Sequence, residues 1–388
     1  MIGFDEALAL VADAAKPLGR ETVPIDRAAG RVLAEAVRAL VDSPPCDVSA
    51  MDGYAVRDAD LPGRLGVAGP SLPGRPAPAL PPGQCVRIFT GAPVPDGADR
   101  IVIQEDVRRE GDVAAFEPPG SARHIRARGS DFARGDMLLA PGRLIDPRAL
   151  AAAAAGDLAE LEVWRRPRLI VLGTGDELAA PGTARATPGA IPESVSLGVA
   201  ALAAQWGAEV VDRKRLDDDL PALERAAAEA LDAADVVVVT GGASVGERDF
   251  AKAMFAPAGL ELLFSKVAIK PGKPVWLGRV GEKLVIGLPG NPSSAMVTAR
   301  LLLAPLLAGL GGRDAGLDWR RAPLAEAIGP CGDRETFVRA TWAGVAVRAF
   351  ANQDSGAQKT LADAALLIRR RAGAPAAQAG DMVEIIDF

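Results

Sequence analysis

The stretch "ADVVVVTGGASVGERDF" (residues 234–250) combines an apolar strand, a glycine-rich turn and the start of a helix. Its four consecutive valines are typical of a strand that is buried on both faces of a parallel sheet. A glycine-rich turn after such a strand offers bare backbone N–H groups to an anion. Because the same turn carries Glu247 and Asp249, the ligand must be compatible with carboxylates as well as with backbone donors.

The sequence on both sides of this stretch repeats the alternation of strands and helices. Short apolar strands alternate with helix-length segments throughout residues 166–312, which predicts a parallel sheet covered on both faces. The fold class is therefore predicted to be multidomain α/β, with a central doubly wound three-layer α/β/α domain. The other predicted strands are "RLIVLG" (168–173), "AEVVD" (208–212) and "KLVIGL" (283–288), with helices near 194–206, near 219–233 and from about 291.

A chain of 388 residues is too long for one hydrophobic core, so several domains are expected. Residues 44–120, rich in Pro and Gly with short apolar alternations, predict a small β-rich domain, and residues 313–388 predict a C-terminal β domain. Residues 1–43 plus 121–165 are expected to form a discontinuous domain. Within it, we expect a helix near the N-terminus and a second one through "RVLAEAVRAL" (31–40).

Composition excludes several classes of function. The net charge is -6, with 44 Lys+Arg against 50 Asp+Glu, so no basic face for nucleic acid is expected. Cys46, Cys85 and Cys331 stand far apart, which argues against a zinc site or disulfides and favours a cytoplasmic setting. No membrane span is expected, because Pro305 and glycines interrupt "LLLAPLLAGLGG". With His124 as the one histidine, histidine-based catalysis is not expected.

Three turns are the places to search for chemistry, because ligands of open α/β sheets bind outside the carboxyl ends of the strands. They are "GTGDEL" (173–178), "TGGASVGERDF" (240–250) and "LPGNPSSAM" (288–296). In the last of them, Asn291 is predicted to cap a helix with Pro292 at its first position. Such a helix end is a seat for a phosphate.

Charged residues near these turns point to a phosphate that carries a metal. Lys270 and Lys273 flank Pro271-Gly272 and favour a multiply charged anion. The acids Asp176, Glu177, Asp249 and the "DDD" at 217–219 would repel that anion unless a divalent ion lay between them, which indicates Mg²⁺. Purely structural turns, solvated lysines and an acidic cluster at a helix N-terminus remain the alternative interpretations.

The N-terminal half holds three more polar turns. They are "SAMDGYAV" (49–56), which contains the chain's single tyrosine, "TGAPVPDGAD" (90–99) and "RHIRARGSD" (123–131). A hairpin at Asp52-Gly53 or a solvated basic loop at 123–131 would explain them without a function.

Six motifs in this order resemble the molybdopterin molybdenumtransferase family, which comprises the bacterial MoeA proteins and the related domain of eukaryotic gephyrin. They are "SAMDGYAV", "TGAPVPDGAD", "GTGDELAAPG", "TGGASVGERDF", "AIKPGKP" and "LPGNPSSA", and the resemblance extends to a C-terminal domain ending "AGDMVEIIDF". It covers the whole chain.

The resemblance implies an enzyme of molybdenum cofactor biosynthesis. Such an enzyme inserts molybdenum from molybdate into adenylylated molybdopterin and releases AMP in a Mg²⁺-dependent step. The resemblance also implies a homodimer whose active site is shared between subunits, with a molybdopterin adenylyltransferase and apo-molybdoenzymes as partners. The implied catalytic residues are Asp52, Thr90, Asp131, Asp217 and Asp249; the implied metal ligands are Glu177 and Asp249; and the implied substrate or anion contacts are Arg126, Gly241, Gly242, Ser244, Lys270, Lys273, Pro289, Gly290, Asn291, Pro292 and Ser355.

The chain departs from the family pattern at three places. It has Ser130 where the family usually has Glu, His124 where it has Asn, and Glu193-Ser194-Val195 where it has an Asp-Thr/Ser-Asn segment. Val195 removes a side chain that could both donate and accept a hydrogen bond. These departures leave an alternative function open: a paralogue with weakened catalysis that acts as a molybdopterin adenylyltransferase-like enzyme or as a cofactor-binding scaffold.

Overall fold

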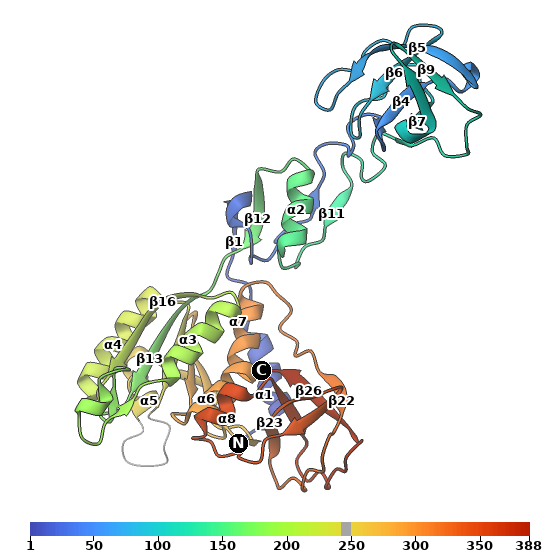
Figure 1. Cartoon of the computed structure of the whole chain (residues 1–388). Coiled ribbons are helices and arrows are strands. Elements are labelled where there is room, and N and C mark those ends of the chain that lie inside the picture. Colours follow the sequence, from blue (N-terminus) through green and yellow to red (C-terminus); the bar gives the residue numbers. More distant parts are fainter. Residues whose placement is uncertain (242–249) are drawn as a thin grey trace. The chain divides into compact units, whose positions relative to one another are not determined.

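The computed structural model describes residues 1–241 and 250–388, which divide into two compact units (Figure 1). We call Met1–Glu21, Gly30–Ala34 and Val163–Phe388 the α/β unit, and Thr22–Ala29 with Glu35–Glu162 the β-rich unit. Both ends of the chain lie in the α/β unit.

A six-stranded sheet forms the centre of the α/β unit, in the order β16-β13-β17-β21-β20-β18. The first four of these strands run parallel, and β20 and β18 are antiparallel additions. The predicted doubly wound fold is therefore confirmed. The strands are β13 (Arg168–Thr174), β16 (Glu209–Leu216), β17 (Val236–Thr240), β18 (Glu261–Phe264), β20 (Trp276–Val280) and β21 (Lys283–Leu288).

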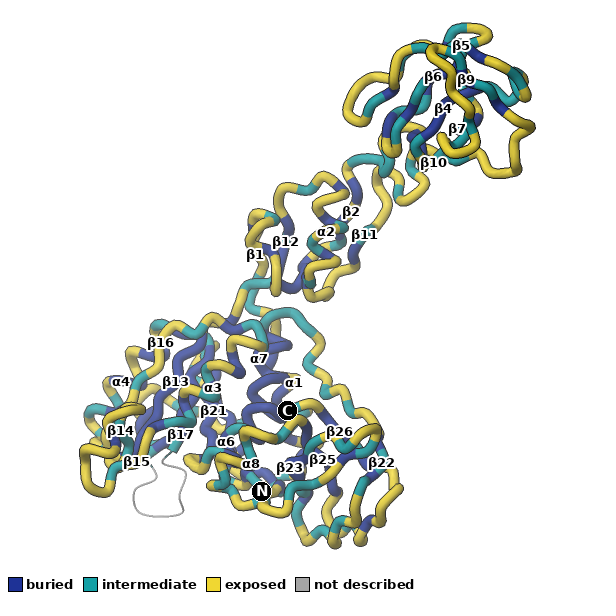
Figure 2. Tube along the Cα trace, in the orientation of Figure 1, coloured by how far each residue is buried: buried dark blue, intermediate teal, exposed yellow. Residues whose placement is uncertain are grey.

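The central strand β17 shows why an unbroken valine run marks this fold. Val236 and Val238 pack into a core cluster with α1, α3 and the helices after residue 292, whereas Val237 and Val239 pack into a cluster with α4 and α5. Successive side chains of a strand point to opposite faces, so both faces must be apolar. Burying each valine contributes roughly 1.5 to 3 kcal/mol. Figure 2 shows the sheet as the buried centre of this unit.

Helices cover the two faces of the sheet. The N-cap residue Asp219 starts α4, because its side chain accepts a hydrogen bond from the backbone N–H of Ala222 at 3.2 Å, with Pro221 in the first turn. The N-terminal helix α1 presents Phe4, Ala7 and Val11 to the core. The helices are α1 (Phe4–Ala14), α3 (Val195–Gln205), α4 (Leu220–Ala233) and the short α5 (Phe250–Ala253).

One long helix runs from Pro292 to Leu310, through α6 (Pro292–Thr298), a π-helical segment at Ala299–Leu303 and α7 (Ala304–Leu310). The prediction that Pro305 interrupts this apolar run was wrong. The wide π turn directly before Pro305 falls where the missing proline N–H breaks the regular ladder, so the helix continues. Among the described residues it is the one helix long and apolar enough to cross a membrane, and 89% of that stretch is buried inside the protein, as in a core helix.

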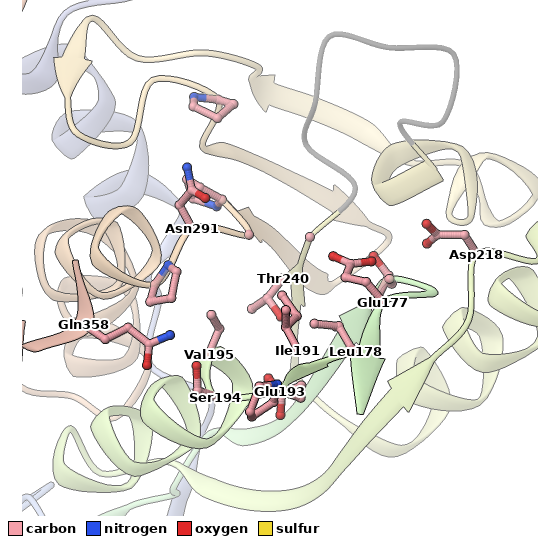
Figure 3. A pocket seen from close by; sticks show the side chains of 18 residues that line it. Glu177, Leu178, Ile191, Glu193, Ser194, Val195, Asp218, Thr240, Asn291 and Gln358 are labelled. Atoms are coloured by element: carbon pink, nitrogen blue, oxygen red, sulfur yellow. The ribbon is translucent and has the colours of Figure 1, made fainter. Parts of the chain in front are cut away.

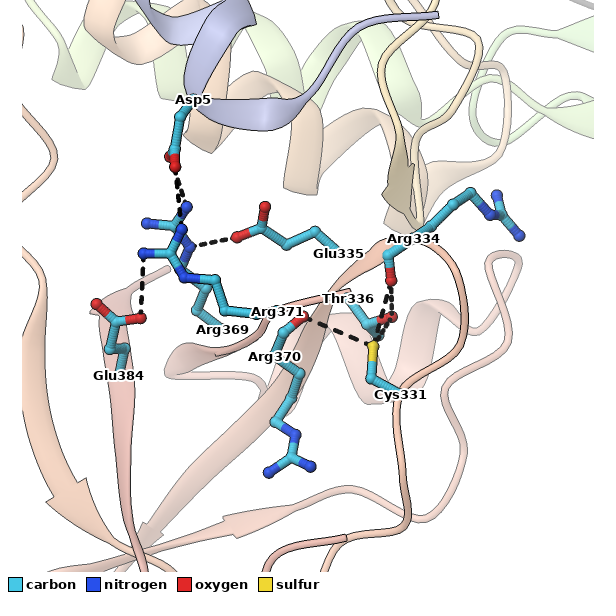
Figure 4. A network of polar contacts seen from close by, with 9 residues as sticks. All are labelled: Asp5, Cys331, Arg334, Glu335, Thr336, Arg369, Arg370, Arg371 and Glu384. Carbon is cyan, nitrogen blue, oxygen red and sulfur yellow. Dashed lines mark hydrogen bonds and ion pairs between the residues drawn. The ribbon is translucent and has the colours of Figure 1, made fainter. Parts of the chain in front are cut away.

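A second sheet closes the C-terminal part of the α/β unit, in the order β19-β23-β25-β26-β22, with β24 paired to β23. Arg369 ties this sheet to α1: its guanidinium donates to Asp5 at 2.6 Å and to Glu335, and Arg371 also contacts Asp5 (Figure 4). The elements are β19 (Ile269–Lys270), β22 (Arg320–Pro323), β23 (Glu335–Ala343), β24 (Ala346–Ala349), β25 (Leu366–Arg370), β26 (Met382–Asp387) and α8 (Gln358–Asp363).

The β-rich unit is built on a six-stranded sheet in the order β7-β4-β6-β5-β9-β8. Smaller pairs accompany it: β10 pairs with β3, and β11 pairs with β2. The elements are β2 (Val37–Arg38), β3 (Val48–Ser49), β4 (Gly53–Val56), β5 (Gly63–Ser71), β6 (Gln84–Ile88), β7 (Arg100–Ile103), β8 (Val107–Glu110), β9 (Val113–Phe116), β10 (Ile125–Arg126), β11 (Met137–Leu139) and α2 (Pro147–Ala155), while β1 (Arg20–Pro24) pairs with β12 (Glu160–Trp164) where the two units join in sequence.

The helix predicted at 31–40 does not form. Val37 and Arg38 belong to β2, and the N–H groups of Ala39 and Leu40 donate to backbone carbonyls of Asp136 and Gly156. Burial alternates along this segment, since Val37 and Ala39 are buried whereas Arg38 and Leu40 are exposed. Pairing with residues about a hundred positions away therefore outweighs the helical preference of a leucine- and alanine-rich sequence.

Candidate functional site

Three strands of the α/β unit end side by side at the carboxyl edge of its sheet. Thr174 closes β13, Thr240 closes β17 and Leu288 closes β21. In the register, Thr240 pairs with Gly173 on one side and with Leu288 on the other. The three glycine-bearing turns singled out in the sequence therefore start from one edge.

A cavity of about 590 Å³ opens at this edge, and we call it the edge cavity (Figure 3). Of the predicted site residues, Gly242, Ser244 and Asp249 lie outside the described residues. The cavity is lined by the predicted residues Glu177, Gly241, Pro289, Gly290, Asn291 and Pro292, and also by Thr174, Gly175, Leu178, Ile191, Pro192, Glu193, Ser194, Val195, Asp218, Thr240, Pro274 and Gln358.

Close backbone packing explains the glycine at the start of the central turn. Gly241 has φ +95°, in the left-handed region, and a Cβ there would lie 2.3 Å from the carbonyl oxygen of Thr174. Any side chain at position 241 would therefore push the turns after β13 and β17 apart and change the cavity floor.

The three aspartates of the "DDD" segment (217–219) lie in three different environments. Asp219 caps α4, Asp218 lines the edge cavity, and Asp217 is 75% exposed with Arg215 at 3.6 Å. The structure thus places Asp218 rather than the predicted Asp217 on the cavity wall. The N–H of Asp218 also donates to the carboxylate of Asp176 at 2.9 Å, which joins this segment to the turn after β13.

Within residues 1–241 and 250–388, no group of three or more His, Cys, Asp or Glu side chains is gathered closely enough to hold a metal ion by itself. Glu177 and Asp218 nevertheless bring two carboxylates to the edge cavity (Figure 3). Mg²⁺ is usually held by one or two carboxylates plus substrate phosphates rather than by a complete protein cage. The donor set therefore fits a Mg²⁺ ion that arrives with a phosphate-bearing substrate.

A buried carboxylate supports the opposite wall of the cavity. Glu193 is 3% exposed, and its oxygens accept hydrogen bonds from the N–H and the hydroxyl of Ser196, both at 2.7 Å, and from Arg213 at 3.0 Å. Glu193 thereby caps α3, since the side chain of the N-cap residue Ser194 makes no capping bond. The departure from the family pattern at Glu193 is thus explained by its role in capping α3. Val195 makes the adjoining part of the cavity wall apolar.

Asn291 does not cap its helix as predicted, although Pro292 does occupy the first turn. Its side-chain amide instead donates to the hydroxyl of Ser355 at 3.0 Å, and the carbonyl of Ser355 accepts the N–H of Ser293 at 3.0 Å. A long-range partner from the loop between β24 and α8 therefore replaces the local cap. The structure in this way joins the predicted residues Asn291 and Ser355.

Sequence reasoning missed Arg339, a fully buried arginine of β23. It donates to the hydroxyl of Ser293 at 2.6 Å and to the carbonyl of Asp354 at 2.9 Å, so it holds the 354–358 loop against the start of α6. That loop leads to Gln358, another missed lining residue. A charged residue inside the apolar alternation "TFVRATW" was the available signal.

The two predicted lysines do not converge on the edge cavity. Lys270 lines a separate cavity of about 230 Å³ together with Arg334, Thr336 and Arg370, and of the segment after it, Pro274 is the residue that reaches the edge cavity. Lys270 belongs to β19, which pairs with β23 of the C-terminal sheet. That Lys270 and Lys273 hold one anion together stays a prediction.

Asp52 and Thr90 meet in the β-rich unit. One carboxylate oxygen of Asp52 accepts the backbone N–H of Thr90 at 2.8 Å and its hydroxyl at 2.9 Å. These bonds hold the pKa of Asp52 below its ordinary value, because they favour the ionised form. Gly53 is not the corner of a hairpin: it opens β4, where a Cβ would lie 2.1 Å from the carbonyl oxygen of Val102.

Arg126 and Asp131 lie in the neighbouring basic loop. Arg126 is exposed on β10, which pairs with the strand leading to Asp52, and the backbone N–H of Asp131 donates to the carbonyl of Ser43 at 3.0 Å. His124 has φ 51°, a left-handed conformation that Asn and His tolerate better than most residues. The exchange of Asn for His at this position is thus compatible with the backbone.

Comparison with known proteins agrees with this description. Residues 2–156 match the family profile "MoeA N-terminal region (domain I and II)", residues 170–309 match "Probable molybdopterin binding domain", and residues 321–388 match "MoeA C-terminal region (domain IV)". The chain is 38% identical to the molybdopterin molybdenumtransferase of Haemophilus influenzae over 80% of this chain and 77% of that protein. It is 40% identical to molybdopterin molybdenumtransferase 2 of Mycobacterium tuberculosis over 74% of each chain.

Solved structures show the same likeness over the full length. The crystal structure of the molybdopterin biosynthesis MoeA protein from Pyrococcus horikoshii superimposes with a TM-score of 0.84 at 29% identity, covering 100% of this chain and 99% of that one. The doubly wound domain and its glycine-lined edge cavity define a class of multidomain proteins with a molybdopterin-binding type of fold. Within that class, the chain belongs to the MoeA family, which confirms the resemblance seen in its motifs.

Proposed function

We propose that the protein is a molybdopterin molybdenumtransferase, which inserts molybdenum from molybdate into adenylylated molybdopterin and releases AMP. The edge cavity carries the proposal. It combines close backbone approach at Gly241, the start of a helix at Pro292 and two carboxylates, Glu177 and Asp218. This combination suits a pyrophosphate that comes with a divalent cation. The names of the relatives in two bacteria support the same activity.

Individual roles follow from position. Glu177 and Asp218, with Asp249, would hold Mg²⁺, which when bound supplies positive charge against the charge that develops as AMP leaves. Backbone N–H groups around Gly241 and Pro292 would receive the phosphates. Asn291 and Ser355, already hydrogen bonded to each other, would orient the substrate beside them.

Asp52 and Thr90 would act from the β-rich unit. The ionised carboxylate of Asp52 has one oxygen occupied by Thr90, and among the described residues its other oxygen accepts no hydrogen bond. That oxygen can accept a hydrogen bond from an attacking hydroxyl or water that carries a proton, and so orient it. We propose a homodimer in which the β-rich unit of one subunit completes the edge cavity of the other.

Purified protein supplied with adenylylated molybdopterin, Mg²⁺ and molybdate tests this function. We expect AMP release together with a cofactor that activates an apo-molybdoenzyme. AMP release at the level of a reaction without protein would reject the proposal. If the protein instead consumed ATP with unmodified molybdopterin, it would be an adenylyltransferase, and tight pterin binding without turnover would indicate a scaffold.

Two inactive variants test the shared site. Asp52→Asn and Glu177→Gln each change one side of the proposed site, so each homodimer should lose most of its AMP release. Mixed and reassociated, the two variants form heterodimers with one intact site. Recovery toward roughly a quarter of the wild-type rate supports sharing between subunits, because random mixing makes half of the dimers mixed and each has one of two sites intact. No recovery would place each site within one subunit.

A further inference from the structure

Arg87 occupies a fixed position in the β-rich unit, between two aromatic rings. It lies on β6 directly opposite Tyr54 of β4, so these two side chains share one face of the sheet, and Phe89 follows directly after the end of β6. The guanidinium carbon lies 5.1 Å from the centre of the Tyr54 ring and 4.9 Å from that of Phe89. Each such contact contributes about 0.5 to 1 kcal/mol at a partly exposed site.

The Tyr54 ring is itself immobilised. It is 5% exposed and packs edge-on against Phe116 with 5.9 Å between ring centres, inside a core cluster of this unit. Because the Tyr54 ring is fixed, the guanidinium of Arg87 that stacks on it is fixed as well. Arg87 therefore has a defined orientation although it lies at the surface of the sheet.

The free edge of the guanidinium is directed at the turn that carries Asp52. One nitrogen of Arg87 donates to the carbonyl of Gly53 at 2.8 Å, and another donates to the side-chain oxygen of Gln104. The backbone N–H of Gln104 in turn donates to the carbonyl of Asp52 at 3.0 Å. Both carbonyls of the Asp52-Gly53 pair are thus fixed, one by Arg87 directly and one by the residue that Arg87 holds.

The carboxylate is fixed separately, through Thr90, which follows Arg87 by three residues beyond the end of β6. The backbone carbonyl of Asp52 is thus held by Gln104 and its carboxylate by Thr90. Gly53 cannot move further toward β7, because it already packs closely against the backbone carbonyl of Val102. A shift of Arg87 would therefore be passed on to Asp52.

We propose that Arg87 is a positioning residue: its two-pronged contact with Gly53 and Gln104 aims the free carboxylate oxygen of Asp52 at the substrate. This inference rests on the proposed function of Asp52. Arginine is required in this position because its planar guanidinium can stack on a ring and donate to two acceptors at the same time. A lysine at this position would keep the positive charge but could not make both hydrogen bonds while stacking on the ring.

A double-mutant cycle tests the proposal in the full-length protein. Arg87→Lys should lower the kcat of AMP release roughly 10- to 100-fold, the scale expected for a small misplacement of a reacting group, with KM changed less than about 2-fold. In the Asp52→Asn background the same substitution should change kcat less than about 2-fold, since the group that Arg87 positions is gone. Arg64→Met is the matched control: Arg64 lies on the same sheet and is 62% exposed, and its ion pair is with exposed Glu110, so the activity of this variant should stay at the wild-type level.

A ¹⁹F NMR measurement on the protein without substrate tests the positioning role of Arg87 independently of the proposed activity. Tyr54 is the chain's single tyrosine, so 3-fluorotyrosine labelling gives one ¹⁹F resonance. We expect Asp52→Asn to shift this resonance when Arg87 is present. In the Arg87→Lys background the same substitution should leave the resonance unshifted, because Arg87 is the residue that connects Asp52 to the Tyr54 ring. A protein that releases no AMP would reject the function, and the ¹⁹F result would still decide the positioning.

Three results would overturn the proposal. In the first, Arg87→Lys lowers kcat by the same factor in the Asp52→Asn background as in the wild-type background, which would mean that the two residues act independently. In the second, the ¹⁹F resonance does not move when Asp52→Asn is introduced into the protein that keeps Arg87. A KM increase without change in kcat would assign Arg87 to ground-state binding and would equally contradict a positioning role.

Discussion

Glu193 and Asp52 are two carboxylates that each precede an element of secondary structure, yet the structure uses them in opposite ways. Glu193 is buried, and both of its oxygens are occupied by Ser196 and Arg213. Asp52 is partly exposed and accepts hydrogen bonds from Thr90 at one oxygen only. An acid whose oxygens are all bound internally holds a wall in place, whereas an acid with an open oxygen can act on a ligand.

The largest effect should come from Asp52. Asp52→Asn keeps the shape and the acceptor for Thr90 but removes the charge, so we expect kcat for AMP release to fall about 10² to 10⁴-fold. The melting temperature should stay within about 1 °C, because the side chain touches solvent and closes no core. The assay is steady-state AMP release. A kcat of the variant within 3-fold of the wild-type value would show that Asp52 takes no part in the chemical step.

Glu193 should show the reverse pattern. Glu193→Ala strands the N–H of Ser196 and the charge of Arg213, and we expect the free energy of unfolding to fall by roughly 2 to 4 kcal/mol in a urea titration. Glu261→Ala is the control, because its pair with Arg279 is exposed and should change stability by no more than about 0.5 kcal/mol. Equal effects of the two substitutions would break the contrast between Glu193 and Asp52.

Thr90→Val sharpens the contrast through pH. The substitution removes the hydroxyl donor and keeps the backbone donor, so the pKa of Asp52 should rise toward its ordinary value. Because a depressed carboxyl pKa stabilises the protein above the unfolded-state pKa and the gain is lost as pH falls through the folded-state pKa, the acid limb of both activity and stability should move to higher pH. At neutral pH we expect a kcat loss of only about 5- to 10-fold. An unshifted acid limb in the pH-rate profile would mean that the Thr90 hydroxyl does not act on Asp52.

The smallest effect belongs to the apolar wall that Glu193 supports. Val195→Asn returns an amide to the edge cavity, and we expect KM for adenylylated molybdopterin to fall by less than about 5-fold, with stability changed by no more than about 0.5 kcal/mol. Val195→Leu serves as the apolar control, and its KM should not fall. An equal fall in both variants would show that hydrogen bonding is not what Val195 removes.

Much of the architecture could be predicted from the sequence because it depends on local patterns. The valine run of β17, the strand and helix periodicity around it, and the glycine turns at the ends of β13, β17 and β21 are all short-range signals. They fix which turns share an edge, and so they predicted about a third of the residues that line the edge cavity. Glu177, Gly241 and Asn291 were found in this way.

The errors concern residues whose position depends on distant partners. The segment at 31–40 pairs with residues 136 and 156 instead of forming a helix. Asn291 meets Ser355 instead of capping its own helix. Arg339 was invisible for the same reason, since its acceptors come from the 354–358 loop and from Ser293. Local sequence patterns do not encode such contacts.

The packing of α1 against the end of the chain has a consequence for synthesis on the ribosome. Phe4 touches Phe337 with 4.8 Å between ring centres, and Asp5 meets Arg369 of β25. At about 5 to 20 residues per second, the apolar face of α1 waits roughly 15 to 70 s for its partners to emerge. The β-rich unit is translated during that interval and can fold first, so α1 is made before that unit and is fully buried only after it.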